Sequence, residues 1–246
     1  MNTMNSNASR SQDRFATTRW SMVMQLGEEH PAQARDALGD LAQRYWYPVY
    51  ALVRRRGHAP AQAGQITGNL LRRLVNDDAG SPQIAARHYR NYLLERVHAL
   101  LDRGHVNASS GRADGPDLAA PDDLERRYLR DHVVPSSPDE AFQRSFALVV
   151  LQRTLRRLRE EATQSGRADL CRALEPFLAR DPAAADYDRI AFQLRSRKVT
   201  LILALKRLRQ RLRELAAQEL SDTVVSPADL ASEQDALLAI LEEVAA

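Results

Sequence analysis

The hydrophobic positions along most of this chain recur at steps of three and four residues, which is the period of an α-helix. This spacing predicts helices over the ranges 15–26, 31–56, 61–76, 82–102, 124–131, 138–162, 168–179 and 226–243. Pro48 lies inside the second range, so a kink or a junction of two helices is expected there. Ser137, Pro138 and Glu140 predict a capped helix start, with an N-cap, a first-turn proline and a capping-box acid. The pattern predicts an all-α protein.

Residues 187–220 are predicted to form a short helix, a tight turn and a long basic helix. The spacing predicts that the long helix buries Val199, Ile202, Leu205, Leu208, Leu212 and Leu215. Between Arg195 and Arg213 the sequence has eight Arg or Lys residues and no acid. Two interpretations are open, a helix that contacts phosphates or a solvated basic face.

Changes in composition predict two small helical domains joined by a flexible linker. The predicted parts are a disordered N-terminus (1–14), a helical domain (15–104), a linker (105–136), a helix-turn-helix domain (137–225) and a C-terminal amphipathic helix (226–246). The linker is rich in Gly, Ser, Asp and Pro, which is typical of flexible connections. The C-terminal helix is expected to pack on the second domain, because four leucines make it amphipathic: Leu230, Leu237, Leu238 and Leu241.

Charge and cysteine content narrow the classes of function. The net charge of the 246-residue chain is only +3, so affinity for nucleic acid has to come from clustered bases. The single cysteine, Cys171, permits no internal disulfide, and this predicts a reducing, cytoplasmic location. No signal peptide and no membrane span are predicted.

No pattern in the sequence indicates catalysis. The six histidines are scattered, and no second cysteine could complete a metal site. The sequence also has no Gly-rich phosphate loop and no nucleophile signature. We therefore predict that the chain is not an enzyme. No catalytic residue, metal, cofactor or small-molecule substrate is expected.

Aromatic residues mixed with arginines offer a second kind of nucleic-acid site. Trp46, between Tyr45 and Tyr47, could stack on bases, but aromatics at helical spacing are more often core residues. A single-strand reader needs rings for unpaired bases and arginines for phosphates. One predicted helix combines the two types: Arg87, Tyr89, Arg90 and Tyr92.

Several segments, in their order along the chain, resemble the extracytoplasmic-function (ECF) group of bacterial RNA polymerase sigma factors. The segments are FATTRW, YWYPVYALVRRRG, YRNYLL, and KRLRQRLREL followed by SDTV. The resemblance covers about residues 15–225. It implies a diverged member of this group, with a region 2-like first domain and a region 4-like second domain. The implied partners are RNA polymerase core, double-stranded promoter DNA, and an anti-sigma factor or Ser/Thr kinase as a candidate regulator.

The resemblance also implies roles for particular residues. Docking on the polymerase would fall to residues of the helix at 61–76: Gln65, Ile66, Gly68, Asn69 and Arg72. Opening of the downstream promoter element would fall to Arg87, Tyr89, Arg90 and Tyr92. Reading of the upstream element would fall to Arg197, Lys198, Thr200, Leu201, Ala204 and Arg207, with Arg209 and Arg211 near phosphates.

This chain departs from the family pattern at both predicted interfaces. The docking helix has no acid over 61–75, and phosphorylation of Thr67 would restore negative charge there, unless Thr67 is a half-buried core residue. Arg195 and Ile202 stand where a turn glycine and a groove-facing lysine are usual. The alternative function is therefore a sigma-like paralogue that acts as a regulatory DNA- or protein-binding module without promoter recognition.

Overall fold

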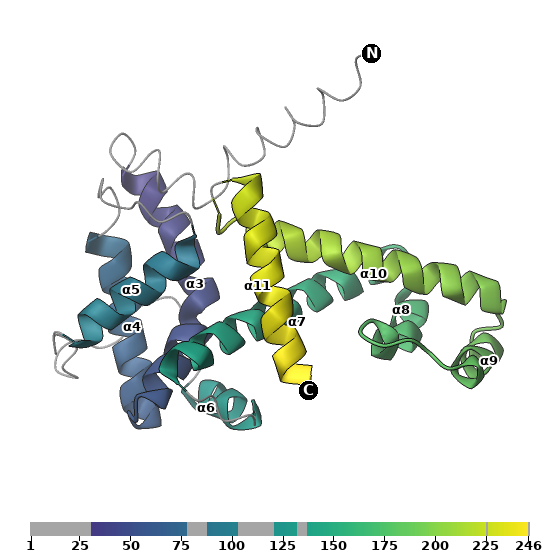
Figure 1. The fold of residues 1–246 in the computed structure, drawn as a ribbon, viewed down its shortest axis with the longest axis horizontal. Helices are drawn as coiled ribbons and strands as arrows, with labels where there is room; N and C mark the ends of the chain where they lie inside the picture. Colours follow the sequence, from purple (N-terminus) through teal and green to yellow (C-terminus); the bar gives the residue numbers. More distant parts are fainter. Residues whose placement is uncertain (1–30, 78–87, 103–120, 132–136, 225, 246) are drawn as a thin grey trace, which may run out of the picture. The chain divides into compact units, whose positions relative to one another are not determined.

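The computed structural model of the chain describes residues 31–77, 88–102, 121–131, 137–224 and 226–245 (Figure 1). These residues are almost entirely helical and contain no β-strand, so the all-α prediction is confirmed. The predicted disordered N-terminus and the helix predicted at 15–26 lie outside the described residues. None of the helices in the described ranges is both long enough and apolar enough to cross a membrane.

The helices follow the predicted ranges closely. They are α3 (Pro31–Arg55), α4 (Pro60–Asp77), α5 (Tyr89–Asp102), α6 (Pro121–Arg130), α7 (Pro138–Gln164), α8 (Ala168–Leu174), the 3₁₀ turn η1 (Glu175–Phe177), α9 (Ala184–Gln193), α10 (Lys198–Ser221) and α11 (Pro227–Ala245). The α3 helix continues through Pro48 as one element. Ser137 caps α7 as predicted, because the Glu140 N–H donates to its Oγ at 3.1 Å.

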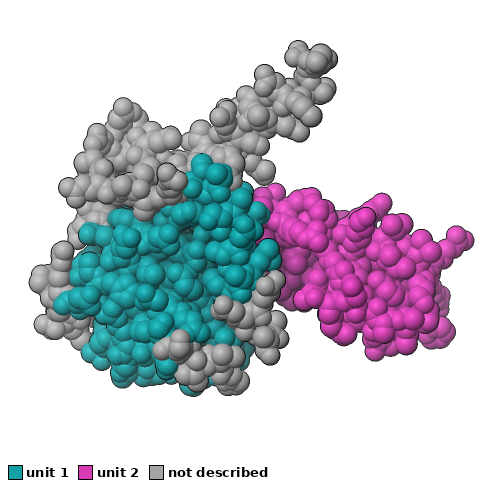
Figure 2. Space-filling view, viewed as in Figure 1, with its two compact units in different colours: residues 1–149, 220–246 teal, residues 150–219 magenta. Residues whose placement is uncertain are grey.

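The chain divides into two compact units, coloured separately in Figure 2. Unit 1 contains residues 1–149 and 220–246, and unit 2 contains residues 150–219. The division falls inside α7 and α10, so the first turns of α7 and the last residues of α10 belong to unit 1. The α6 helix, which lies inside the predicted linker, packs against α3 and α4 in unit 1.

Aromatic residues of α3 form the centre of unit 1. The buried ring of Tyr45 lies 5.0 Å from that of Tyr89 and stacks on Phe142 and Phe146 at 6.1 and 5.1 Å. Tyr45 is fully buried, so its place in this stack is a core position and not a stacking platform for bases.

A close approach between α3 and α4 explains one glycine of the predicted docking helix. A Cβ atom on Gly68 would lie 3.1 Å from the ring of Trp46, which is tighter than ordinary contact. A larger side chain at position 68 would therefore require the Trp46 ring to shift, and the assignment of the half-buried Gly68 to polymerase docking stays a prediction.

Partly buried polar contacts attach α6 to α3. Arg54 donates to both carboxylate oxygens of Glu125, at 2.9 and 2.8 Å, and the Tyr50 hydroxyl donates to the same carboxylate at 2.7 Å. The Arg54 hydrogen bonds, together with that of Tyr50, hold the pKa of Glu125 below its ordinary value despite its partial burial. The Arg127 guanidinium lies over the Tyr47 ring at 3.8 Å. These contacts fix a helix that sequence composition had suggested to be linker.

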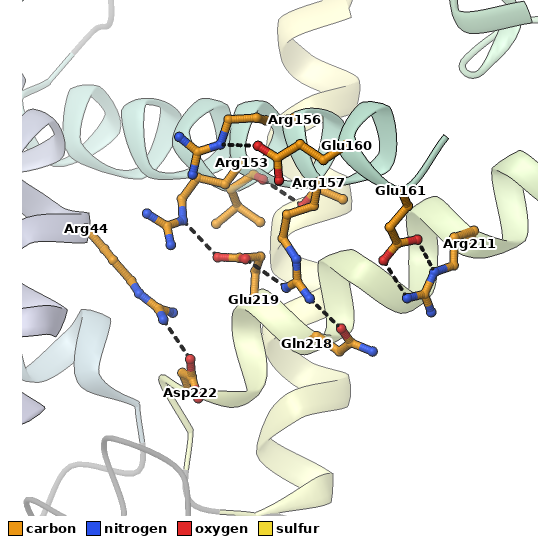
Figure 3. Close-up of polar contacts among 12 residues, drawn as sticks. Arg44, Arg153, Arg156, Arg157, Glu160, Glu161, Arg211, Gln218, Glu219 and Asp222 are labelled. Carbon is orange, nitrogen blue, oxygen red and sulfur yellow. Dashed lines mark hydrogen bonds and ion pairs between the residues drawn. The ribbon is translucent and has the colours of Figure 1, made fainter. Parts of the chain in front are cut away.

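Ion pairs between α7 and α10 support unit 2 (Figure 3). Arg153 and Arg157 both donate to the buried carboxylate of Glu219, at 2.8 and 3.0 Å. Glu161 lies one turn after Arg157 on α7, and Arg211 of α10 donates to both of its oxygens at 2.8 and 2.7 Å. These ion pairs join α7 and α10 at two places. They therefore fix the position of α10, the long helix of the helix-turn-helix segment.

Candidate nucleic-acid interface

A small hydrophobic core positions α9 and α10 in unit 2. Its buried members come from α8, η1, α9 and α10: Leu174, Phe177, Ile190, Leu201 and Leu205. Four residues connect the end of α9 to the start of α10, which is typical of a helix-turn-helix. The predicted order of short helix, tight turn and long helix is therefore present.

The turn between the two helices has a left-handed residue at its centre. Arg195 has φ 47°, the only positive φ of a non-glycine residue in the described ranges. The Ser196 N–H donates to the Ala191 carbonyl at 3.0 Å, and the Arg195 N–H donates to Phe192 at 3.4 Å. These are the two hydrogen bonds of a Schellman cap, in which glycine is the preferred left-handed residue.

Arg195→Gly is expected to stabilise the protein by about 0.5–1 kcal/mol. A side chain in the left-handed region costs about 1–2 kcal/mol, and the greater freedom of glycine in the unfolded chain offsets part of this gain. The measurement is urea unfolding followed by circular dichroism. Gly166, with φ 66°, provides the reverse change, and Gly166→Arg is expected to destabilise. A loss of stability in Arg195→Gly would contradict the expectation.

Four exposed cations surround the turn and the first turns of α10. They are Arg195, Arg197, Lys206 and Arg207. None of them forms an ion pair or a hydrogen bond through its side chain with another residue that the structure describes. The N-terminal end of α10 adds the positive end of a helix dipole to the same region. This surface is therefore suited to binding an anion.

The other predicted cations already have partners within unit 2. Arg209 donates to the carbonyls of Phe177 and Arg180, at 2.8 and 2.7 Å. Arg211 binds Glu161, and its hydrogen bonds lower the pKa of that carboxyl. These contacts already engage donors of Arg209 and Arg211 within the fold, and the assignment of both residues to phosphates stays a prediction. Lys198 pairs with the exposed Asp188 at 2.9 Å.

The predicted orientation of α10 about its axis is wrong in its first turns. Leu201, predicted to contact DNA, is fully buried in the core, while Val199 and Ile202, predicted to be buried, are 67% and 45% exposed. Ala204 is half-buried against the same core, whereas Thr200 is exposed as predicted. The sequence from Val199 to Leu205 is apolar on nearly every side, so periodicity alone does not fix which side is buried.

The predicted docking face of α4 is divided between core and surface. Ile66 is 2% exposed and Thr67 is fully buried, so neither side chain is available to a partner or a kinase. The phosphorylation hypothesis for Thr67 is corrected on this ground. Gln65 is exposed, and Arg72 donates to the half-buried Asn69 at 3.0 Å.

The residues predicted to open promoter DNA are buried in unit 1. Tyr89, Arg90 and Tyr92 are 0%, 8% and 7% exposed, and Arg87 lies outside the described residues. Buried rings and a buried guanidinium cannot receive unpaired bases. The described residues that were predicted to open the downstream promoter element are therefore not exposed in this structure.

The C-terminal segment contributes to this burial. The Tyr89 N–H donates to the Thr223 carbonyl at 2.9 Å. Arg90 donates to Glu233 of α11 at 2.8 Å, and the His88 ring lies 3.5 Å from the same carboxylate. The C-terminal helix was predicted to pack on the second domain, and this is wrong, because α11 belongs to unit 1 and provides a buried carboxylate to α5.

Lys206 and Leu203 are exposed on α10 but were not among the predicted site residues. The signal that could have found them is the acid-free sequence between Arg195 and Arg213. Within the described parts of the chain, no group of His, Cys, Asp and Glu could hold a metal ion. Comparison of the chain with protein-family models, curated proteins and solved structures found no match. A function is therefore inferred from the residues of the chain itself.

Proposed function

We propose that the chain is a sigma-factor-like transcription protein that binds duplex DNA through α9 and α10 of unit 2. The observation that carries the proposal is the set of four exposed cations, without acidic partners in the described residues, around a helix-turn-helix. In such motifs the second helix enters the major groove while basic side chains contact phosphates. Affinity is then expected to depend strongly on salt, because each neutralised phosphate releases counterions.

The test is a fluorescence-anisotropy titration of the full chain with short labelled duplexes over a range of salt concentrations. The double variant Arg197→Ala, Arg207→Ala removes two phosphate contacts, so the slope of log affinity against log salt is expected to fall by about 2. At about 0.1 M salt this corresponds to binding on the order of 60-fold weaker.

A matched control removes two exposed arginines that have partners elsewhere in unit 2. Arg156 pairs with Glu160 and Arg172 with Asp169, each within its own helix. Arg156→Ala, Arg172→Ala is expected to bind DNA as the native chain does. Salt-independent binding, or an equal loss of affinity in both double variants, would overturn the proposal.

Two forms of this function differ in whether the chain opens promoters. An initiation factor would dock on RNA polymerase core and expose its downstream residues, whereas a regulatory paralogue would only bind DNA or protein. The burial of Arg90, Tyr92 and Ile66 favours the second form. Affinity capture with purified core polymerase distinguishes them, since stable retention of the native chain would restore the first form.

A further inference from the structure

Three apolar side chains are exposed on one side of the first two turns of α10. Val199, Ile202 and Leu203 are 67%, 45% and 51% exposed, and their spacing of three and four residues places them on one side of the helix. Leu201 and Leu205 fill the core from the opposite side. The three exposed side chains therefore add nothing to the core, and water contacts them in the isolated chain.

Cations border this apolar face along the helix. Arg197 precedes it and Lys206 and Arg207 follow it, and the sequence contains no carboxylate between Arg195 and Arg213. An apolar face bordered by these cations is complementary to a ligand whose apolar groups lie between rows of negative charge. Duplex DNA has this arrangement, since phosphates line both sides of the major groove.

The chemistry of the groove restricts which bases such a face can contact. Val, Ile and Leu side chains neither donate nor accept hydrogen bonds, so they cannot satisfy the polar edges of guanine, cytosine or adenine. Thymine alone presents an apolar group in the major groove, its C5 methyl. Burying an unsatisfied polar edge under these side chains would be unfavourable, whereas burying a methyl group is favourable.

We propose that Val199, Ile202 and Leu203 recognise thymine C5 methyl groups, while the bordering cations hold the backbone. This inference rests on the proposed function, and it assigns a base preference to the same helix. Val199 and Leu203 lie one turn apart on α10 and contact the C5 methyl groups of successive thymines. Ile202 lies beside them on the same face and enlarges the apolar contact.

Replacing thymine by deoxyuridine tests the inference, because the substitution removes the C5 methyl and leaves every hydrogen-bonding group of the base pair in place. The native chain is titrated with a duplex of alternating A·T pairs and with the same duplex containing deoxyuridine. Each methyl buried is worth a factor of about four in affinity, so the thymine duplex is expected to bind at least fourfold tighter. A G·C duplex with 5-methylcytosine is likewise expected to bind tighter than one with cytosine.

The double variant Ile202→Ala, Leu203→Ala is expected to prefer the thymine duplex over the deoxyuridine duplex by a clearly smaller factor than the native chain does, because only the contact of Val199 remains. Leu238→Ala is the matched control, since this α11 leucine is 57% exposed in unit 1, and the native preference is expected to persist in it. Circular dichroism of each variant verifies folding.

The failures of the two proposals are distinguishable. Equal, salt-dependent binding of thymine and deoxyuridine duplexes by the native chain would overturn the methyl contact and leave DNA binding intact. An unchanged preference in the Ile202→Ala, Leu203→Ala variant would also overturn it, because the removed side chains would then not contact the methyl groups. Absence of binding to every duplex at low salt would overturn both proposals.

Discussion

Glu233→Ala is expected to lower the free energy of unfolding by about 3–5 kcal/mol, because it leaves a buried guanidinium without its carboxylate. The side chains of Arg90 and Glu233 are only 10% and 2% exposed, and their atoms Nη2 and Oε2 lie 2.8 Å apart. Arg90 also donates to Gln143 and lies 5.4 Å from the centre of the Phe146 ring. The measurement is urea unfolding followed by tryptophan fluorescence, since Trp46 belongs to unit 1.

Removing both charges separates the cost of an unpaired ion from the value of the pair. Arg90→Met, Glu233→Leu removes both charges of this buried pair, and such replacements are often neutral, so most of the lost stability is expected to return. Asp235→Ala alters an exposed acid of the same helix and is expected to change stability by less than about 0.5 kcal/mol. A double variant as unstable as Glu233→Ala would show that packing, and not charge pairing, holds α11.

Local sequence patterns predicted the helices because each pattern reports on residues within a few turns. The contact between Arg90 and Glu233 joins positions 143 residues apart, and no local pattern contains it. The same limit explains why α6 was placed in a linker. Its position depends on the bidentate contact between Glu125 and Arg54, which are 71 residues apart.

At the candidate interface, the sequence predicted the helices and the position of the turn but not which side of α10 is buried. Leu201 and Ile202 are adjacent apolar residues, and only packing against Leu174 and Phe177 decides which of them enters the core. The sequence also did not predict which arginines are exposed and which bind other groups of the protein. Arg207 is exposed without a partner in the described residues, whereas Arg209 two positions later binds main-chain carbonyls of η1 and the residues after it.

Phe142→Ala is expected to destabilise unit 1 by about 3–5 kcal/mol, the usual cost of truncating a buried aromatic side chain. Phe142 is fully buried and stacks on Tyr45 at 6.1 Å, so its loss opens a cavity in the centre of this unit. The sequence placed Phe142 in the helix-turn-helix domain at 137–225, whereas the structure places the start of α7 in unit 1. Tryptophan fluorescence during urea unfolding reports on unit 1 through Trp46, and alkylation of the buried Cys171 thiol reports on unit 2.

Because tryptophan fluorescence reports on unit 1 and Cys171 alkylation on unit 2, comparing them tests whether α7 is divided between the two units. The fluorescence midpoint is expected to fall by more than the midpoint for protection of Cys171, because the cavity forms among residues of unit 1. Phe192→Ala is the matched control, since this ring is 87% exposed and its removal is expected to change the free energy of unfolding from either probe by less than about 0.5 kcal/mol. A larger shift at Cys171 than at Trp46 would place Phe142 in the core of unit 2 and restore the domain boundary that composition predicted. A larger shift at Trp46 would show that α7 contributes its first turns to one core and its later turns to another.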